Sequence, residues 1–306
     1  LDDVDDVILI DNNDNVIDHH SWSSEKISSS ITRSPDIVGN FLIHKLVNDS
    51  LFSPGFLLNS SLFDSDSDGI HNLIDKINQG IEKVKPTYHK IQEEAGLSNL
   101  SHNSTHHTFV SYRGVLDLLD PNPTHDILTE FFGGKYILNT MGAAWCDPRG
   151  AYNYTQKIHR DIRSYSSSSR LYLNGVILLD DTNEENGATH MIIKEYNTEE
   201  KPSDDYFMSH SERICGKKGD IILFDGNMWH SAGVNQTDKT RRIFSQLFTK
   251  PFVKQQMDYP RALGLDFKME ISENLAQILG YNSMTPSNLR EFYKPKEQRF
   301  YQSDQG

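Results

Sequence analysis

Three residues of this chain have the types and spacing of an iron-binding site. His159 and Asp161 stand two positions apart, and His230 follows much later. Two imidazoles and one carboxylate on one side of iron(II) leave the opposite positions open for a co-substrate and dioxygen. On an extended strand, residues i and i+2 point to the same face, so one short segment can direct both His159 and Asp161 at one ion. The pattern favours a metal-dependent oxygenase.

His230 is the last residue of the segment GDIILFDGNMWH at positions 219–230, and Arg241 and Arg242 follow this segment. Neutral imidazole and carboxylate suit iron, because no soft thiolate is present to favour zinc or copper(I). A 2-oxo acid could chelate such an iron and pair its second carboxylate with the planar fork of an arginine. Arg241 is the candidate for this role, and Arg242, on the opposite face of the same strand, is the alternative.

The elements that must position these residues are short strands. We expect strands over residues 136–140, 154–159, 170–179, 189–194, 220–224 and 242–248, separated by Gly, Asn, Asp or Ser turns. Many short strands with polar turns indicate an antiparallel sandwich or barrel, and jelly rolls belong to this class. Helices are expected over 70–81, 124–132, 273–279 and 286–293. The predicted fold class is therefore mainly β with flanking helices.

The first part of the chain is polar. Residues 1–35 are rich in Asp, Asn and Ser, so we expect a leader or linker that buries little apolar surface. Residues 36–306 are expected to form one domain with N-terminal and C-terminal helices, the first beginning near Pro35. The stretch around His102, His106 and His107 is predicted to be a solvated loop rather than a metal cluster, because no apolar periodicity fixes its geometry.

An acidic run from Asp64 to Gly69 resembles the start of a calcium loop. An EF-hand requires Glu at the twelfth loop position, and this chain has Asp75 there. The preferred interpretation is an acidic cap on the helix expected over residues 70–81.

Composition limits the partners. A formal net charge of −13, with no basic cluster, opposes binding to nucleic acid or to anionic lipid. No apolar run approaches the ~18 residues that would span a bilayer. The two cysteines, Cys146 and Cys215, allow at most one bridge, so a reducing compartment, the cytoplasm, is the default expectation. The expected partner is a small-molecule substrate.

The sequence also resembles a known family, the phytanoyl-CoA dioxygenase-like branch of the iron(II)/2-oxoglutarate oxygenases. The matching pieces are QKIHRD at 156–161, ENGAT at 185–189, residues 219–235, TRR at 240–242 and ILGY at 278–281. The resemblance implies a double-stranded β-helix, also described as a jelly-roll or cupin-like fold. It implies that the iron ligands are His159, Asp161 and His230.

For the co-substrate, the resemblance implies that Arg241 anchors the distal carboxylate of 2-oxoglutarate, with further contacts from Gln156 and Thr189. Two departures stand out. Residues 191–196 replace the turn that follows the N-G-A-T segment in relatives, and Ala232 lacks a hydroxyl that relatives often have there. The first departure implies a different lid over the substrate, and the second implies that one contact with the co-substrate is absent.

The activity so implied is oxidation, by default hydroxylation, of an unactivated C–H bond of a small molecule. It would use iron(II), 2-oxoglutarate and dioxygen, and release succinate and carbon dioxide. Arg160, Arg163 and Trp229 are candidates for substrate contacts. Two alternatives stay open: a non-catalytic jelly-roll binding module, and a cupin-like metal enzyme that does not use 2-oxoglutarate.

Overall fold

The computed structural model describes most of the chain from residue 68 onward and three short earlier segments. The described ranges are 5–10, 16–22, 55–58, 68–97, 103–120, 122–149, 154–193 and 198–305, and up to residue 71 only the backbone is described. The helix expected near Pro35, His102 and most of the acidic run after Asp64 lie outside these ranges. The division into a leader, 1–35, and a domain, 36–306, stays a prediction.

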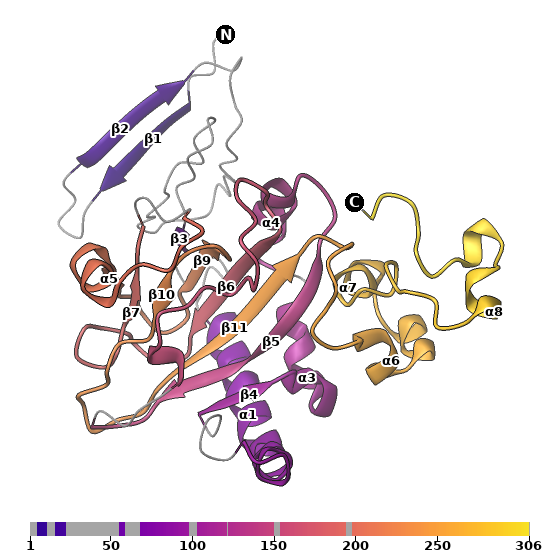
Figure 1. The fold of residues 1–306 in the computed structure, drawn as a ribbon, viewed down its shortest axis with the longest axis horizontal. Coiled ribbons are helices and arrows are strands. Elements are labelled where there is room, and N and C mark those ends of the chain that lie inside the picture. The colour runs from indigo at the N-terminus through magenta and orange to yellow at the C-terminus, as the bar shows by residue number, and fades with distance from the viewer. Residues whose placement is uncertain are drawn as a thin grey trace.

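Two antiparallel sheets form the centre of the molecule (Figure 1). The larger has six strands in the order β3 (Gly55–Leu58), β9 (Ile221–Asp225), β6 (Tyr172–Leu178), β11 (Arg241–Thr249), β5 (Ile137–Cys146) and β4 (Ser104–His106). The smaller has the order β10 (His230–Ser231), β7 (Thr189–Met191) and β8 (Glu212–Ile214). Separately, β1 (Asp5–Ile10) and β2 (Val16–Trp22) pair with each other. The predicted fold class, mainly β with a double-stranded β-helix, is confirmed.

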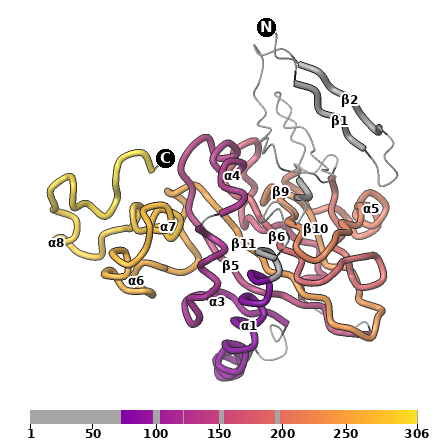
Figure 2. Tube along the Cα trace, turned by 180° about the vertical axis from the view of Figure 1, so that it is seen from behind, coloured from indigo at the N-terminus to yellow at the C-terminus, as the bar shows by residue number. Residues whose placement is uncertain are grey.

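Each face of the large sheet packs against a different layer, because successive side chains of a strand point to opposite faces. On one face, Phe244 and Phe248 of β11 join a core cluster with Ile74 and Ile77 of α1 (Asp68–Glu94). Figure 2 shows this helical side. Burial of each such side chain contributes about 1.5–3 kcal/mol to folding. On the other face, Val176 and its neighbours on β6 and β9 pack against the small sheet in a second cluster.

The remaining helices and turns flank the sheets. They are α3 (Thr108–Ser111), η2 (Arg113–Leu118), α4 (His125–Phe132), η3 (Tyr154–Gln156), α5 (Asp204–His210), α6 (Tyr259–Leu263), η4 (Leu265–Glu270), α7 (Glu273–Ile278), α8 (Leu289–Phe292) and η5 (Lys296–Gln298). Figure 1 shows α6, α7 and α8 together at one end of the large sheet. Within the described ranges, no helix combines the length and the apolar character that crossing a bilayer requires.

Two predicted elements were wrong. Residues 154–159 are not a strand: η3 occupies the start, and only His159 pairs in extended geometry, through an isolated bridge to His230. The described part of the polar stretch near His106 is not a solvated loop, since it forms β4 and the beginning of α3. In both cases contacts with distant strands decide the local structure, and a local pattern does not contain them.

Candidate metal and co-substrate site

The segment that carries His159 and Asp161 is fixed to β10 and to the turn after β9 by backbone hydrogen bonds. The N–H groups of His159 and His230 each donate to the other's carbonyl at 2.9 Å, which sets the two histidines side by side. The chain bends after His159, and the N–H of Ile162 donates to the Gly226 carbonyl at 3.2 Å. Asp161 is held between these two anchors, opposite the histidines.

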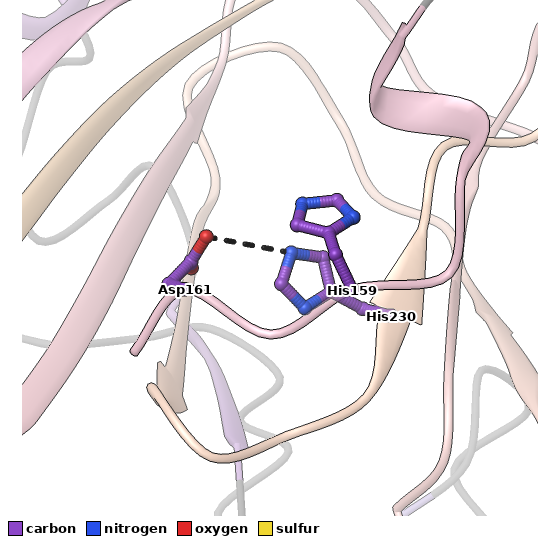
Figure 3. A group of neighbouring side chains, drawn as sticks. All are labelled: His159, Asp161 and His230. Atoms are coloured by element: carbon purple, nitrogen blue, oxygen red, sulfur yellow. Dashed lines mark ion pairs between the residues drawn. The ribbon is translucent and has the colours of Figure 1, made fainter. Parts of the chain in front are cut away.

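The three predicted ligands meet in space. One donor atom from each of His159, Asp161 and His230 lies within 4.8 Å of the others. Asp161 Oδ1 is 3.8 Å from His230 Nε2, and the two imidazole centroids are 4.2 Å apart. Figure 3 shows the rings beside each other with Asp161 facing His230. The arrangement suits a single metal ion bound on one face by two imidazoles and one carboxylate.

Backbone carbonyls set the tautomer of both histidines. His159 Nδ1 lies 2.7 Å from the Lys157 carbonyl, and His230 Nδ1 lies 2.9 Å from the Met228 carbonyl. A carbonyl oxygen only accepts, so each Nδ1 must carry the proton and each Nε2 presents a lone pair. Burial, reinforced by the nearby His159, lowers the pKa of His230 to about 4. His230 is therefore neutral near pH 7, as a metal ligand must be.

A hydrogen-bond chain from the large sheet orients the carboxylate. Asn174 of β6 donates from Nδ2 to Asp161 Oδ2 at 2.6 Å, and Ser245 of β11 donates to Asn174 Oδ1 at 2.8 Å. Asn174 is buried, at 5% exposure, so its amide is desolvated and its bonds are not exchanged with bulk water. The chain leaves Asp161 Oδ1 directed at the histidines.

A cavity of about 380 Å³ opens between the two sheets and includes all three of these side chains. Its volume falls in the range of roughly 300–1,000 Å³ that is common for small-molecule sites. The pleat of β11 turns alternate residues into it: Arg241, Ile243, Ser245 and Leu247. Much of the wall is apolar, so the cavity limits water around the three ligands.

Arg241 closes one end of the cavity. Its side chain is 2% exposed, and Nη2 donates to the Gly187 carbonyl and to Cys146 Sγ, the latter at 3.2 Å. The buried Nε has no hydrogen-bond partner, and no carboxylate of the described residues forms an ion pair with this guanidinium. A buried charge without a counterion is costly. The arrangement fits a site that receives the carboxylate of a bound molecule.

Comparison with known proteins agrees with this geometry. The family model for phytanoyl-CoA dioxygenase matches residues 71–243, which is more than half of the chain. The chain belongs to the phytanoyl-CoA dioxygenase family. The resemblance read from the sequence is thereby confirmed, and the matched range contains all three candidate ligands together with Arg241.

Two other proteins are similar to parts of this chain. The uncharacterized protein Rv1501 of Mycobacterium tuberculosis is 31% identical over 153 residues, which are 50% of this chain and 56% of that protein. The dioxygenase olcK of Penicillium canescens is 27% identical over 218 residues, covering 62% of this chain and 68% of that protein. The chain thus spans little more than half the length of the mycobacterial relative.

Solved structures with a similar fold include two proteins of low sequence identity. EctD from S. alaskensis, solved with 2-oxoglutarate and 5-hydroxyectoine, has a TM-score of 0.48 at 15% identity, covering 64% of this chain and 72% of that one. AviO1 from Streptomyces viridochromogenes Tue57 has a TM-score of 0.45 at 17% identity, covering 60% and 86%.

Of the five other predicted site residues, three line the cavity and two do not. Thr189, at the start of β7, lines the cavity, as do Arg160 and Arg163. Gln156, at the end of η3, and Trp229 are not among the lining residues. The Trp229 indole donates to Thr198 Oγ1 at 3.3 Å, outside the cavity wall. The roles predicted for these five residues stay predictions.

The two neighbouring arginines of the family motif differ in surroundings. Arg242 donates from Nε and Nη2 to the two oxygens of Asp180, at 2.9 and 2.8 Å, and from Nη1 to Asn78 Oδ1 of α1 at 3.1 Å. This guanidinium is already paired, on the helical side of the sheet. Arg242 does not line the cavity, whereas Arg241 does, so Arg241 stays the preferred candidate.

Residues that line the cavity but were not predicted as site residues include Asn174, Ser245, Cys146 and His106. A signal was present for Asn174, which is the one polar side chain in the strand sequence YLNGVIL besides the tyrosine at its start. Cys146 faces Arg241 directly, because the two residues are cross-strand partners on β5 and β11. His106 lines the cavity from β4, which local sequence did not predict as a strand.

Proposed function

We propose that this chain is an iron(II)- and 2-oxoglutarate-dependent dioxygenase that oxidises, by default hydroxylates, an unactivated C–H bond of a small molecule. The observation that supports the proposal is one cavity lined by three convergent side chains that could hold a metal ion and by a buried guanidinium without a carboxylate partner among the described residues. The three ligands alone would fit many metal sites, and a buried arginine alone would fit a purely structural role. Together they match a metal and a dicarboxylic 2-oxo acid bound side by side.

In this proposal the metal is held by His159 Nε2, His230 Nε2 and Asp161. When bound, iron(II) with 2-oxoglutarate and dioxygen supplies the oxidising chemistry, with release of succinate and carbon dioxide. The carbonyls of Lys157 and Met228 keep both imidazoles in the ligating tautomer.

The guanidinium of Arg241 would pair with the distal carboxylate of the co-substrate. Its neutral partners, the Gly187 carbonyl and Cys146 Sγ, hold Nη2 without cancelling its charge. Thr189 lies along the same wall and is suited to a hydroxyl contact. The apolar residues between these groups, such as Ile243 and Val176, exclude water from the reacting centre.

The proposal is tested by succinate release from purified protein, with iron(II) and 2-oxoglutarate supplied or withheld in turn. We expect release that requires both and that is lost in Asp161→Ala. The matched control is Asp238→Ala, which removes an exposed carboxylate paired with Arg149 at the surface and should not alter release. Turnover of a substrate that continues without 2-oxoglutarate would support a cupin-like metal enzyme instead. Absence of all turnover, with metal bound, would support a binding module.

A further inference from the structure

The charge of the cavity is opposite in sign to that of the chain. The chain carries a formal net charge of −13, yet the cavity is lined by Arg160, Arg163 and Arg241 and by a single carboxylate, Asp161. Concentration of one sign of charge in a cleft attracts ligands of the other sign. The position and pairing of each arginine determine which bound molecule that charge can serve.

The proposed function uses only one of the three arginines, Arg241. The substrate class inferred from the other two rests on that function. Iron(II) and Arg241 together balance Asp161 and the two carboxylates of 2-oxoglutarate, so the loaded centre is electrically neutral. Arg160 and Arg163 then remain as two uncompensated positive charges on the cavity wall. Within the described ranges, neither forms an ion pair with a carboxylate.

Arg163 lies toward the opposite end of β11 from Arg241. Asp161 is bonded to Asn174, which lies beside Leu247 in the sheet, whereas Arg241 is six positions earlier on β11. The N–H of Ile162, which precedes Arg163, donates to the Gly226 carbonyl, and the N–H of Gly226 donates to the Tyr172 carbonyl. Tyr172 pairs with Thr249, the last residue of β11, whereas Arg241 is the first.

Arg160 is held in place by neutral groups. Its Nη1 donates to the Thr198 carbonyl at 3.2 Å, and its guanidinium carbon lies 4.9 Å from the Trp229 ring centroid and 5.3 Å from that of Tyr165. Cation–π contacts fix a guanidinium without neutralising it. Arg163 is exposed, so its fork can reach a ligand at the entrance. Arg160 thus contributes a positive charge at a fixed position. Arg163 contributes a guanidinium that can donate two hydrogen bonds to a ligand.

From this arrangement we infer that the primary substrate is a small organic acid with an apolar body. Its carboxylate pairs with Arg163 at the entrance, in the field of Arg160, and its body extends along Leu247 toward the candidate metal ligands. A guanidinium fork matches the two oxygens of a carboxylate. A cavity of about 380 Å³, shared with the co-substrate, excludes a bulky substrate.

The test uses a panel of small aliphatic and aromatic carboxylic acids, each with its primary amide and with the phosphate ester of the matching alcohol. The protein is loaded with iron(II) and 2-oxoglutarate, and stimulated succinate release is measured for every compound. We expect the stimulating compounds to be acids, with the paired amides about tenfold or more weaker, as expected for loss of a charge-assisted pair. Equal stimulation by amides, preference for phosphate esters, or stimulation by no acid at all overturns the inference.

Variants separate a binding role from a structural one. Arg163→Gln should raise the KM of the best acid about tenfold or more and remove the preference for acid over amide, while Arg163→Lys should retain the preference in part. Arg290→Gln, which removes one exposed guanidinium on α8, is the matched control and should change neither value. An acid preference that persists in Arg163→Gln contradicts the assignment.

The two proposals fail in distinguishable ways. If no compound elicits succinate release and 2-oxoglutarate does not bind, the proposed function fails and the substrate inference falls with it. If amides are oxidised as fast as acids, the proposed function stands and only the substrate class is wrong.

Discussion

Arg241 and Arg242 are adjacent in sequence and lie on opposite faces of one strand. Arg241 enters the cavity, where it has no carboxylate partner, and Arg242 pairs with Asp180 and Asn78 on the helical side. The two side chains therefore form a natural comparison, because the same truncation removes the same charge at positions 241 and 242.

We predict that Arg241→Ala raises the KM for 2-oxoglutarate about 100-fold, since a desolvated charge-assisted pair is lost. Arg242→Ala should leave that KM unchanged and lower the free energy of unfolding by about 1 kcal/mol, because its ion pair is partly exposed. Steady-state kinetics and urea denaturation measure the two effects. Equal effects of the two variants on the KM would contradict the assignment of Arg241.

Asn174 acts on the metal site through Asp161, so it is a positioning residue. Asn174→Ala should weaken metal binding about 10- to 100-fold, the usual consequence of losing an outer hydrogen bond to a ligand. Ser245→Ala should have a smaller effect, because Ser245 contacts only Asn174 in this chain of hydrogen bonds. Anaerobic titration with iron(II) or manganese(II) gives the affinities. Unchanged affinity in Asn174→Ala would show that Asp161 is oriented by other contacts.

At the scale of single elements, Gly142 allows β4 to approach β5 closely. A Cβ added at Gly142 would lie 2.1 Å from the backbone oxygen of Thr105, so β4 would have to move. We predict that Gly142→Ala destabilises the fold by about 1–3 kcal/mol and displaces His106 from the cavity wall. Gly175→Ala is the control: its Cβ would meet the flexible Leu223 side chain at 3.2 Å. Similar losses of unfolding free energy in both variants would contradict this account.

The last residue of β9, Asp225, carries a buried carboxyl group. Burial raises the pKa of Asp225 to about 6 from a usual 3.8, although the Asn227 N–H donates to it at 2.7 Å. Between about pH 4 and pH 6 the folded protein holds a proton that the unfolded chain has released. The contribution of Asp225 to stability therefore falls as pH rises through this window.

Asp225→Asn removes that ionisation and keeps an acceptor for Asn227. We predict a variant more stable than the wild type at pH 8, on the order of 1–3 kcal/mol, with a difference that disappears toward pH 4. Urea denaturation at several pH values measures it. A variant that is less stable at pH 8 would show that the charged carboxylate contributes favourable interactions that exceed its desolvation.

The elements differ in how well sequence predicts them. The strands β6, β9 and β11 were recognisable because apolar runs end at polar turns, and their predicted positions are confirmed within about two residues. The strand β4 was not recognisable, because its Ser-Thr-His sequence contains no apolar residue. Its extended structure depends on pairing with β5. The helix α1 continues past the predicted end to Glu94, with Pro86 inside it, since its apolar face packs against the sheet.

At the scale of the whole molecule, the site also depends on contacts between distant segments, which a local sequence pattern does not contain. The spacing of His159 and Asp161 predicted two ligands on one segment, but the closure of the triad by His230 depends on the bridge between that segment and β10. A polar residue in an apolar strand marks Asn174, but its contact with Asp161 joins two distant segments, and neither local sequence contains that contact. Ligand types are therefore readable from sequence, and the residues that orient them require the fold.

The most direct test of the central claim is anaerobic titration of the protein with iron(II) in the presence of 2-oxoglutarate, followed by visible absorption. The account predicts a weak metal-to-ligand charge-transfer band that saturates at one iron per chain and is absent in His230→Ala. Iron bound by the wild-type protein, with 2-oxoglutarate in excess and no such band, would contradict the account.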